Sequence, residues 1–186
     1  MTFKKNKYLI VRNFLDKEFL DFIQDYFFIR AKSGVADRND TQAPGSFSFY
    51  ADPLVETILE RSCQELSEKT KIDLLPTYSY TRIYKKGNEL KIHRDRPSCE
   101  VSATLSIGFD GKVNPIYFSS KENDDNPTKI LLNPGDLCLY KGCELWHWRP
   151  PFKNKWYLQA FLHYVDSNGE YRDFVYDKRP CLAVSK

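Results

Sequence analysis

The chain has 186 residues, of which 28 are Lys or Arg and 25 are Asp or Glu, so its formal charge of +3 is too small to indicate nucleic acid as a partner. Its length is typical of one domain with a sizeable buried core, and we expect that domain to span residues 1–186. No signal-peptide core follows Met1, no apolar run reaches membrane-spanning length, and the five cysteines form no close pairs, which together favour a soluble cytoplasmic protein without a membrane partner.

The first third of the chain has the periodicity of two amphipathic helices. Asp16 is a suitable N-cap for a first helix, whose apolar side chains recur at helical spacing. These side chains are Phe19, Leu20, Phe22, Ile23, Tyr26 and Phe27. Residues 32–48 are polar and contain glycine and proline breakers. Asp52 and Pro53 then mark the start of a second helix, because proline is favoured at the first helical position.

From Leu75 onwards the pattern changes to the period of two that is typical of strands. Tyr78, Tyr80, Arg82 and Tyr84 alternate with smaller or aliphatic residues. Similar segments between turn residues predict further strands at 90–95, 101–109, 113–118, 128–133, 137–141, 144–148, 155–165 and 170–176.

Two helices followed by about eight short strands predict a mainly β fold with flanking helices. The expected architecture is a double-sheet jelly roll, in which residues 1–72 form a helical support and residues 73–177 form the core.

The most informative residues are His93, Asp95 and His147, which include two of the three histidines of the chain. Alternate strand residues share a face, so we expect His93 and Asp95 to project to the same side. His147 would come from a strand that faces them across the barrel. Two imidazoles and one carboxylate are the ligands of the facial triad that binds non-haem Fe(II). The residues alone leave open a surface histidine beside a solvated aspartate.

A wider resemblance supports the metal site. The run from Arg82 to Asp95 resembles the Tyr-x2-Gly-x2-Tyr-x2-His-x-Asp pattern of the Fe(II)/2-oxoglutarate-dependent dioxygenases, closest to the prolyl 4-hydroxylase-like branch. Leu90 stands where the second tyrosine of that pattern is usual. The opening strand-then-helix run from Tyr8 is also similar to this branch. The resemblance implies a double-stranded β-helix, cupin-like core preceded by two helices.

The resemblance also implies a site for 2-oxoglutarate. The run from Asn154 to His163 resembles the family segment whose lysine anchors the distal carboxylate of this cosubstrate, and the match points to Lys155. Arg149 is the competing anchor, because it lies two residues after His147. A buried dicarboxylate needs such a cation.

Other residues are implied around the cosubstrate. Tyr84 would be a second donor to the distal carboxylate, and His163 would lie near the reacting end, on the same strand face as Lys155. Thr104 or Ser102 could offer a hydroxyl.

The activity implied by the resemblance is hydroxylation of an unactivated C–H bond, in a prolyl or other residue of a peptide or in a small molecule. Fe(II), O2 and 2-oxoglutarate would be required, with ascorbate as a reductant. Arg82, Tyr80, Arg96 and Trp148 are expected at the mouth of the site, where aromatic and cationic groups suit an extended peptide or an acidic small molecule. The sequence does not indicate an oligomeric state.

Two other functions remain open at this point. An AlkB-like nucleic-acid demethylase has the same ligands, but that family carries paired arginines after the distal histidine, where this chain has Lys155, Tyr157 and Gln159. A non-catalytic jelly roll or a cupin could hold a metal without oxygenase activity, since fold alone does not fix function.

Overall fold

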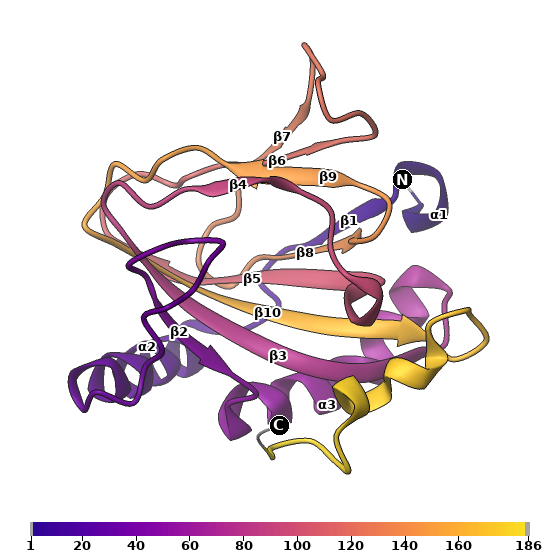
Figure 1. The fold of residues 1–186 in the computed structure, drawn as a ribbon, viewed down its shortest axis with the longest axis horizontal. Coiled ribbons are helices and arrows are strands. Elements are labelled where there is room, and N and C mark those ends of the chain that lie inside the picture. The colour runs from indigo at the N-terminus through magenta and orange to yellow at the C-terminus, as the bar shows by residue number, and fades with distance from the viewer. Residues whose placement is uncertain (1, 185–186) are drawn as a thin grey trace.

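Two antiparallel β-sheets face each other in this computed structural model, which describes residues 2–184. Figure 1 shows the sheets as two layers that converge at one side, with helices beneath the larger one. The fold is the predicted β-rich double-stranded β-helix with N-terminal helices.

The larger sheet contains six strands in the order β1-β8-β5-β10-β3-β2. Their bounds are Tyr8–Val11 for β1, Leu137–Lys141 for β8, Val101–Phe109 for β5, Trp156–Asp166 for β10, Leu74–Lys85 for β3 and Phe47–Tyr50 for β2. One face of this sheet packs on the helices and the other lines the interior between the sheets. On β10, Leu158 and Leu162 therefore belong to the core against the helices, whereas Phe161 and His163 face the interior.

The smaller sheet has four strands in the order β4-β9-β6-β7 and forms the opposite wall. Its strands are Leu90–His93 for β4, Trp146–Arg149 for β9, Ile116–Ser119 for β6 and Thr128–Ile130 for β7. β4 is an edge strand, and its residues Leu90 and His93 line the opening between the sheets.

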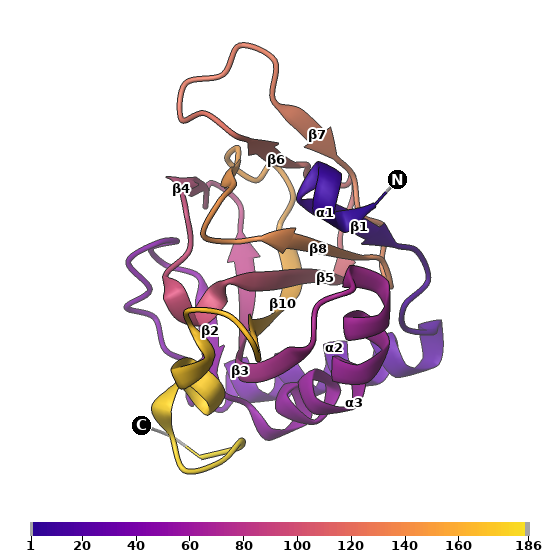
Figure 2. The same cartoon turned by 90° about the vertical axis from the view of Figure 1, so that its right-hand side faces the viewer.

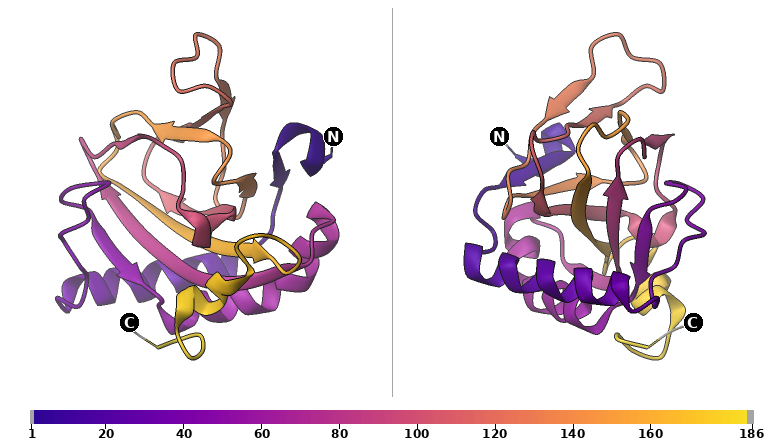
Figure 3. Two further views of the ribbon diagram at one scale, coloured as in Figure 1. Left: turned by 45° about the vertical axis from the view of Figure 1, so that its right-hand side comes forward. Right: turned by 90° about the vertical axis from the view of Figure 1, so that its left-hand side faces the viewer.

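Two long helices cover the outer face of the larger sheet (Figures 2 and 3). Helix α2 spans Lys17–Lys32, and its N-cap Asp16 accepts a hydrogen bond from the Phe19 N–H. Helix α3 spans Pro53–Thr70, with Asp52 as N-cap and proline at the first position. Both starts confirm the capping prediction. The buried faces of these helices pack against β3, β5 and β10.

Several short elements were not predicted. Helix α1 (Phe3–Asn6) and strand β2 lie in the first 72 residues, which were expected to be helical support. Strand β2 has four residues, too few for a clear period of two. Strand β1 was expected only from the resemblance of the run from Tyr8 to a strand-then-helix entry, and the structure has this strand, followed by α2. The strand expected at 170–176 is wrong, because this segment contains the 3-10 helix η2 (Arg172–Lys178). Another 3-10 helix, η1, spans Pro97–Cys99.

No helix within residues 2–184 is long and apolar enough to cross a membrane. The division of the chain into a support of residues 1–72 and a core of residues 73–177 stays a prediction.

Candidate metal centre and cosubstrate pocket

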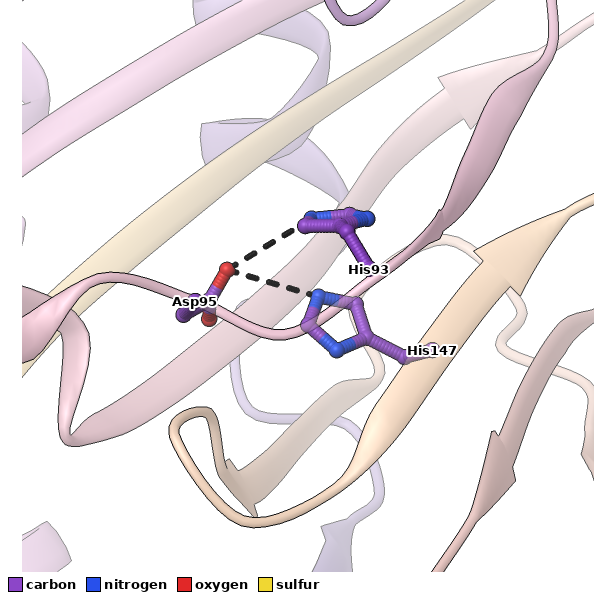
Figure 4. A group of neighbouring side chains, drawn as sticks. All are labelled: His93, Asp95 and His147. Carbon is purple, nitrogen blue, oxygen red and sulfur yellow. Dashed lines mark ion pairs between the residues drawn. The ribbon is translucent and has the colours of Figure 1, made fainter. Parts of the chain in front are cut away.

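His93, Asp95 and His147 converge at the open edge of the smaller sheet, as Figure 4 shows. Asp95 Oδ1 lies 3.6 Å from Nε2 of His93 and 3.4 Å from Nε2 of His147. Two atoms that bind one metal at right angles, each at ~2.1 Å, lie ~3 Å apart. The observed spacing therefore fits a shared divalent ion after a small contraction.

The two histidines are neighbours in one sheet. His93 and His147 are register partners on the antiparallel strands β4 and β9, and their rings lie 4.2 Å apart. The expectation that they face each other across the barrel was wrong, because the chain returns to the same sheet after crossing the larger one. Convergence of the side chains is nevertheless as expected.

Both imidazoles are oriented by the backbone. Nδ1 of His93 donates to the Lys91 carbonyl at 2.8 Å, and Nδ1 of His147 donates to the Leu145 carbonyl at 3.0 Å. Because a carbonyl can only accept, each Nδ1 carries a proton, which leaves Nε2 as the atom of each ring that can bind a metal. This arrangement is typical of metal-binding histidines. His147 is 2% exposed, so its ring is held rigidly.

Asp95 lies beyond the end of β4, where no strand pairing holds it. Its N–H donates to the Gly142 carbonyl, and its Oδ2 accepts from the Ser102 hydroxyl at 2.7 Å. Burial would raise the pKa of Asp95, but the charge of His147 and hydrogen bonds from both histidines lower that pKa well below its ordinary value. The residue is thus a carboxylate, as a metal ligand must be.

His163 stands behind the carboxylate. Its Nδ1 lies 2.9 Å from the Ser102 oxygen, and its ring packs on Tyr78 at 4.5 Å. Burial lowers the pKa of His163 to about 4, against a smaller opposing effect of Asp95. His163 is therefore neutral at physiological pH. Since Ser102 gives its proton to Asp95, Nδ1 of His163 is the donor to Ser102.

A cavity of about 480 Å³ opens directly beside the three ligand atoms. Its floor includes Tyr78, Tyr80, Phe161 and His163 from the larger sheet, and its outer wall is the loop of residues 37–42. Arg82, Arg94 and Arg96 also line it. This volume is sufficient for a small molecule beside the three candidate ligand residues.

Two of the three arginines in the cavity are already neutralised. Arg82 donates through Nε to Asp40 Oδ2 at 2.7 Å, and Arg96 makes a bidentate pair with Asp177 at 2.8 and 3.0 Å. Both were among the cationic groups expected to suit an extended peptide or an acidic small molecule. Because each has its own carboxylate partner, only the exposed Arg94, which lies over the Trp146 ring, keeps an unneutralised charge among these three.

The Arg82–Asp40 pair fixes the outer wall. Oδ1 of Asp40 accepts from the backbone N–H groups of Gln42 and Ala43, while Oδ2 also accepts from the Tyr80 hydroxyl. Burial would raise the pKa of Asp40, but the charge of Arg82 and these hydrogen bonds lower it. The loop is thereby held on β3 by one carboxylate.

We expect Asp40→Asn to lower the free energy of unfolding by about 3–5 kcal/mol, because it leaves the buried Arg82 guanidinium without its partner. The stabilisation is complete above the ordinary carboxyl pKa of 3.8 and disappears as the pH falls below that value towards the lowered folded-state pKa. Urea unfolding of both proteins at neutral and acid pH measures this. The difference between them should shrink in acid. Asp37→Asn, at an exposed loop position, is the control and should be close to neutral.

A second polar cluster lies deeper in the barrel around Arg149. This side chain is 1% exposed; it donates to the Asn114 carbonyl at 3.0 Å, lies 3.5 Å from Thr104 Oγ1 and packs over the Tyr157 ring. Within residues 2–184 it has no carboxylate partner, and its Nε has no acceptor. Gln159, which donates to Thr104, also has an unpaired buried oxygen. Unpaired groups of this kind are costly and typical of ligand sites.

The structure does not bring Lys155 to this cluster. Lys155 is exposed and precedes β10, so the expectation that it faces the interior together with His163 was wrong. Its charge acts instead on the half-buried Asp110. Trp148 is also displaced: since His147 and Arg149 point inward, Trp148 points outward, where its ring stacks on Tyr117 at 5.5 Å.

Tyr84 is fully buried, and its hydroxyl accepts from Arg82 at 2.9 Å. It stacks on Phe152 at one end of the same interior.

Two residues of the cavity, Tyr78 and Phe161, were not predicted from the sequence. They share strand parity with Tyr80 and His163 and could have been found by that signal. Nothing in the polar segment of residues 32–48 could have identified Asp40.

Comparison with known proteins gives structural matches only. No protein-family model matches the chain, and no relative is found among curated proteins. A prolyl 4-hydroxylase from Pseudomonas putida matches with a TM-score of 0.70 at 16% identity, over 86% of this chain and 92% of that chain.

Two further solved structures are similar. A prolyl hydroxylase from Trichoplax adhaerens, in complex with a hypoxia inducible factor peptide fragment, has a TM-score of 0.72 at 13% identity, over 89% of this chain and 86% of that chain. HygX from Streptomyces hygroscopicus, with nickel and 2-oxoglutarate bound, has a TM-score of 0.66 at 12% identity, over 89% of this chain and 85% of that chain. The chain therefore has the fold of the 2OG-Fe(II) oxygenases, with several prolyl hydroxylases among its structural neighbours.

Proposed function

We propose that this chain is an Fe(II)- and 2-oxoglutarate-dependent oxygenase. The observation that carries the proposal is the convergence of two Nε2 atoms and one carboxylate on an open cavity, with both Nδ1 protons held by backbone carbonyls. Three protein ligands leave further coordination positions for a chelating cosubstrate and for O2. A purely structural metal site would close the coordination sphere with protein groups.

The donor set fits Fe(II). His93, Asp95 and His147 offer nitrogen and oxygen without thiolate, which suits this metal. Bound there, the ion would supply activation of O2. The chain would orient the reactants and limit access of water, since the ligands line a cavity walled by the larger sheet and the loop of residues 37–42.

We assign the distal carboxylate of 2-oxoglutarate to Arg149 in preference to Lys155. Arg149 projects inward from the same strand as His147, and its guanidinium is buried without a carboxylate. Thr104 and Gln159 would complete the polar lining of that end, and His163 would stay near the metal end. A charge-assisted hydrogen bond is the interaction that such a buried guanidinium requires.

We propose a prolyl or other residue in a peptide as the substrate, with a small molecule as the alternative. The cavity beside the metal is walled by aromatic rings, and two of its arginines are neutralised internally. It therefore suits a neutral group better than the acidic small molecule considered from sequence. Two of the structural neighbours support a peptide: they are prolyl hydroxylases, one of which is bound to a peptide.

Formation of succinate from 2-oxoglutarate tests the proposal. With Fe(II), O2 and a library of proline-containing peptides, the wild-type chain should form succinate and add one oxygen atom to a peptide, measured by mass spectrometry. In His147→Ala succinate formation should fall by more than ~100-fold, because loss of a direct ligand exceeds the effect of losing an outer partner. Equal succinate formation by both proteins would contradict the proposed site. Metal binding without succinate would favour a non-catalytic jelly roll.

A further inference from the structure

The segment Arg94–Arg96 carries the carboxylate ligand but belongs to no strand or helix. It connects the end of β4 to η1. On one side it is held by the hydrogen bond from Asp95 N–H to Gly142. Since strand pairing does not fix this segment, its position depends on contacts made by its side chains.

The C-terminal strap, defined as residues 172–184, holds the segment from the other side. Both carboxylate oxygens of Asp177 accept from Arg96, at 2.8 and 3.0 Å. Asp177 is 1% exposed and also accepts from the Tyr50 hydroxyl at 2.7 Å. Figure 1 shows this part of the chain, in yellow, lying beside β3 and close to η1. Asp177 is thus a buried carboxylate that links β2 with the residue after Asp95.

The backbone of the strap is unusual at this point. Tyr176, Asp177 and Lys178 have positive φ angles of 53°, 55° and 61°, although none is glycine. Three consecutive left-handed residues are costly and persist only where the surroundings determine them. A second buried pair holds the strap here: Nη2 of Arg179 lies 2.6 Å from Glu56 Oε1. The left-handed turn directs the Asp177 side chain towards Arg96.

A short chain of contacts leads from the Arg96–Asp177 pair to the carboxylate ligand Asp95. The Arg96 guanidinium lies over the Tyr78 ring at 4.7 Å, and that ring packs on His163 at 4.5 Å. His163 binds Ser102, which donates to the second oxygen of Asp95. Arg96, Tyr78 and His163 all line the cavity.

We infer that the C-terminal strap is part of the metal centre, with Asp177 as a positioning residue that clamps the Asp95 segment through Arg96. This inference rests on the proposed function. The strap touches neither the metal position nor the cosubstrate site, and it acts by holding the carboxylate ligand where the two histidines meet. Loss of the clamp should weaken metal binding in a chain that remains folded.

Anaerobic calorimetric titration with Fe(II) alone tests the clamp. Asp177→Asn is the main variant, because asparagine tolerates the left-handed conformation and removes only the charge. We expect its Fe(II) dissociation constant to rise about 10-fold, the usual effect of losing an outer partner of a metal ligand. Arg96→Gln should give a similar increase. The double variant should be no weaker than either single variant, since both remove the same contact.

Tyr50→Phe is the matched control. It removes the hydrogen bond from the Tyr50 hydroxyl to Asp177 and leaves the pair with Arg96 intact, so Fe(II) affinity should stay at the wild-type value. Circular dichroism confirms that each variant is folded. If wild type binds Fe(II) and Asp177→Asn binds it equally well, the clamp is contradicted and the proposed function is not. If Tyr50→Phe loses affinity as Asp177→Asn does, general loosening of the strap replaces the clamp. A folded wild-type chain that binds no Fe(II) overturns the proposed function and the clamp together.

Discussion

Replacing Arg149 by methionine is expected to weaken 2-oxoglutarate binding by about 100-fold or more, because a buried charged partner of the distal carboxylate is removed. The same change should leave the cosubstrate-free chain as stable as wild type or more stable. Arg149 is a fully buried guanidinium with an unpaired Nε, and replacing an uncompensated buried charge by an apolar side chain relieves that cost. Opposite effects on binding and on stability are the signature of a ligand site.

Isothermal titration with 2-oxoglutarate in the presence of Fe(II), together with thermal unfolding of the free protein, measures both effects. Lys155→Met is the matched control and should bind 2-oxoglutarate as wild type does, since Lys155 is exposed. A large loss of affinity in Lys155→Met, with Arg149→Met unaffected, would show that Lys155 and not Arg149 binds the distal carboxylate.

A single methyl group at Gly142 is expected to remove most of the metal affinity. A Cβ at this position would lie closer than real contacts allow to the carbonyl oxygen of Cys99 and to Oδ2 of Asp95, and 2.9 Å from the Cβ of Asp95. The Cys99 contact is with backbone, and the Cβ of Asp95 is bonded directly to its backbone, so the chain around Asp95 must move. We expect Gly142→Ala to weaken Fe(II) binding by about 100-fold, at the upper end of outer-shell effects, and to lower stability by about 1–3 kcal/mol as overpacking does.

Gly34→Ala separates these two effects. Gly34 has a φ of 84° with open space around it, so alanine there introduces backbone strain of roughly 1–2 kcal/mol away from the site. Fe(II) titration and urea unfolding of both variants give the comparison. Gly34→Ala should lose stability and keep Fe(II) affinity. Wild-type Fe(II) affinity in Gly142→Ala would show that Asp95 does not depend on the close approach of Gly142.

Hydrophobic periodicity was sufficient to predict most of the fold. The two long helices begin directly after Asp16 and Asp52, as these capping residues predicted, and β8 has the predicted bounds. Failures occurred where local pattern is weak. β2 has only four residues and follows a polar segment, and its place is set by pairing with β3. The apolar residues at 170–176 resemble a strand, but they pack as a bent 3-10 helix beside β3.

Some parts of the site could be predicted from the sequence and others could not. Residue type and spacing identified His93, Asp95 and His147, and strand parity brought the first two together although Asp95 lies past the strand end. Parity would also have placed Arg149 inside and Trp148 outside, but the family resemblance gave Lys155 precedence. Charges in the cavity were not predictable, because Asp40 and Asp177 neutralise Arg82 and Arg96 from distant parts of the chain.

Anaerobic titration of the wild-type chain with Fe(II) and then 2-oxoglutarate tests the central claim most directly. The three-ligand site with open coordination positions predicts that cosubstrate chelation produces the weak visible metal-to-ligand charge-transfer band expected of this class of enzyme. The band should be absent in His147→Ala and should require much more 2-oxoglutarate in Arg149→Met. A folded wild-type chain that shows no band, or a band that survives in His147→Ala, would contradict the assignment of His93, Asp95 and His147 as an oxygenase metal centre.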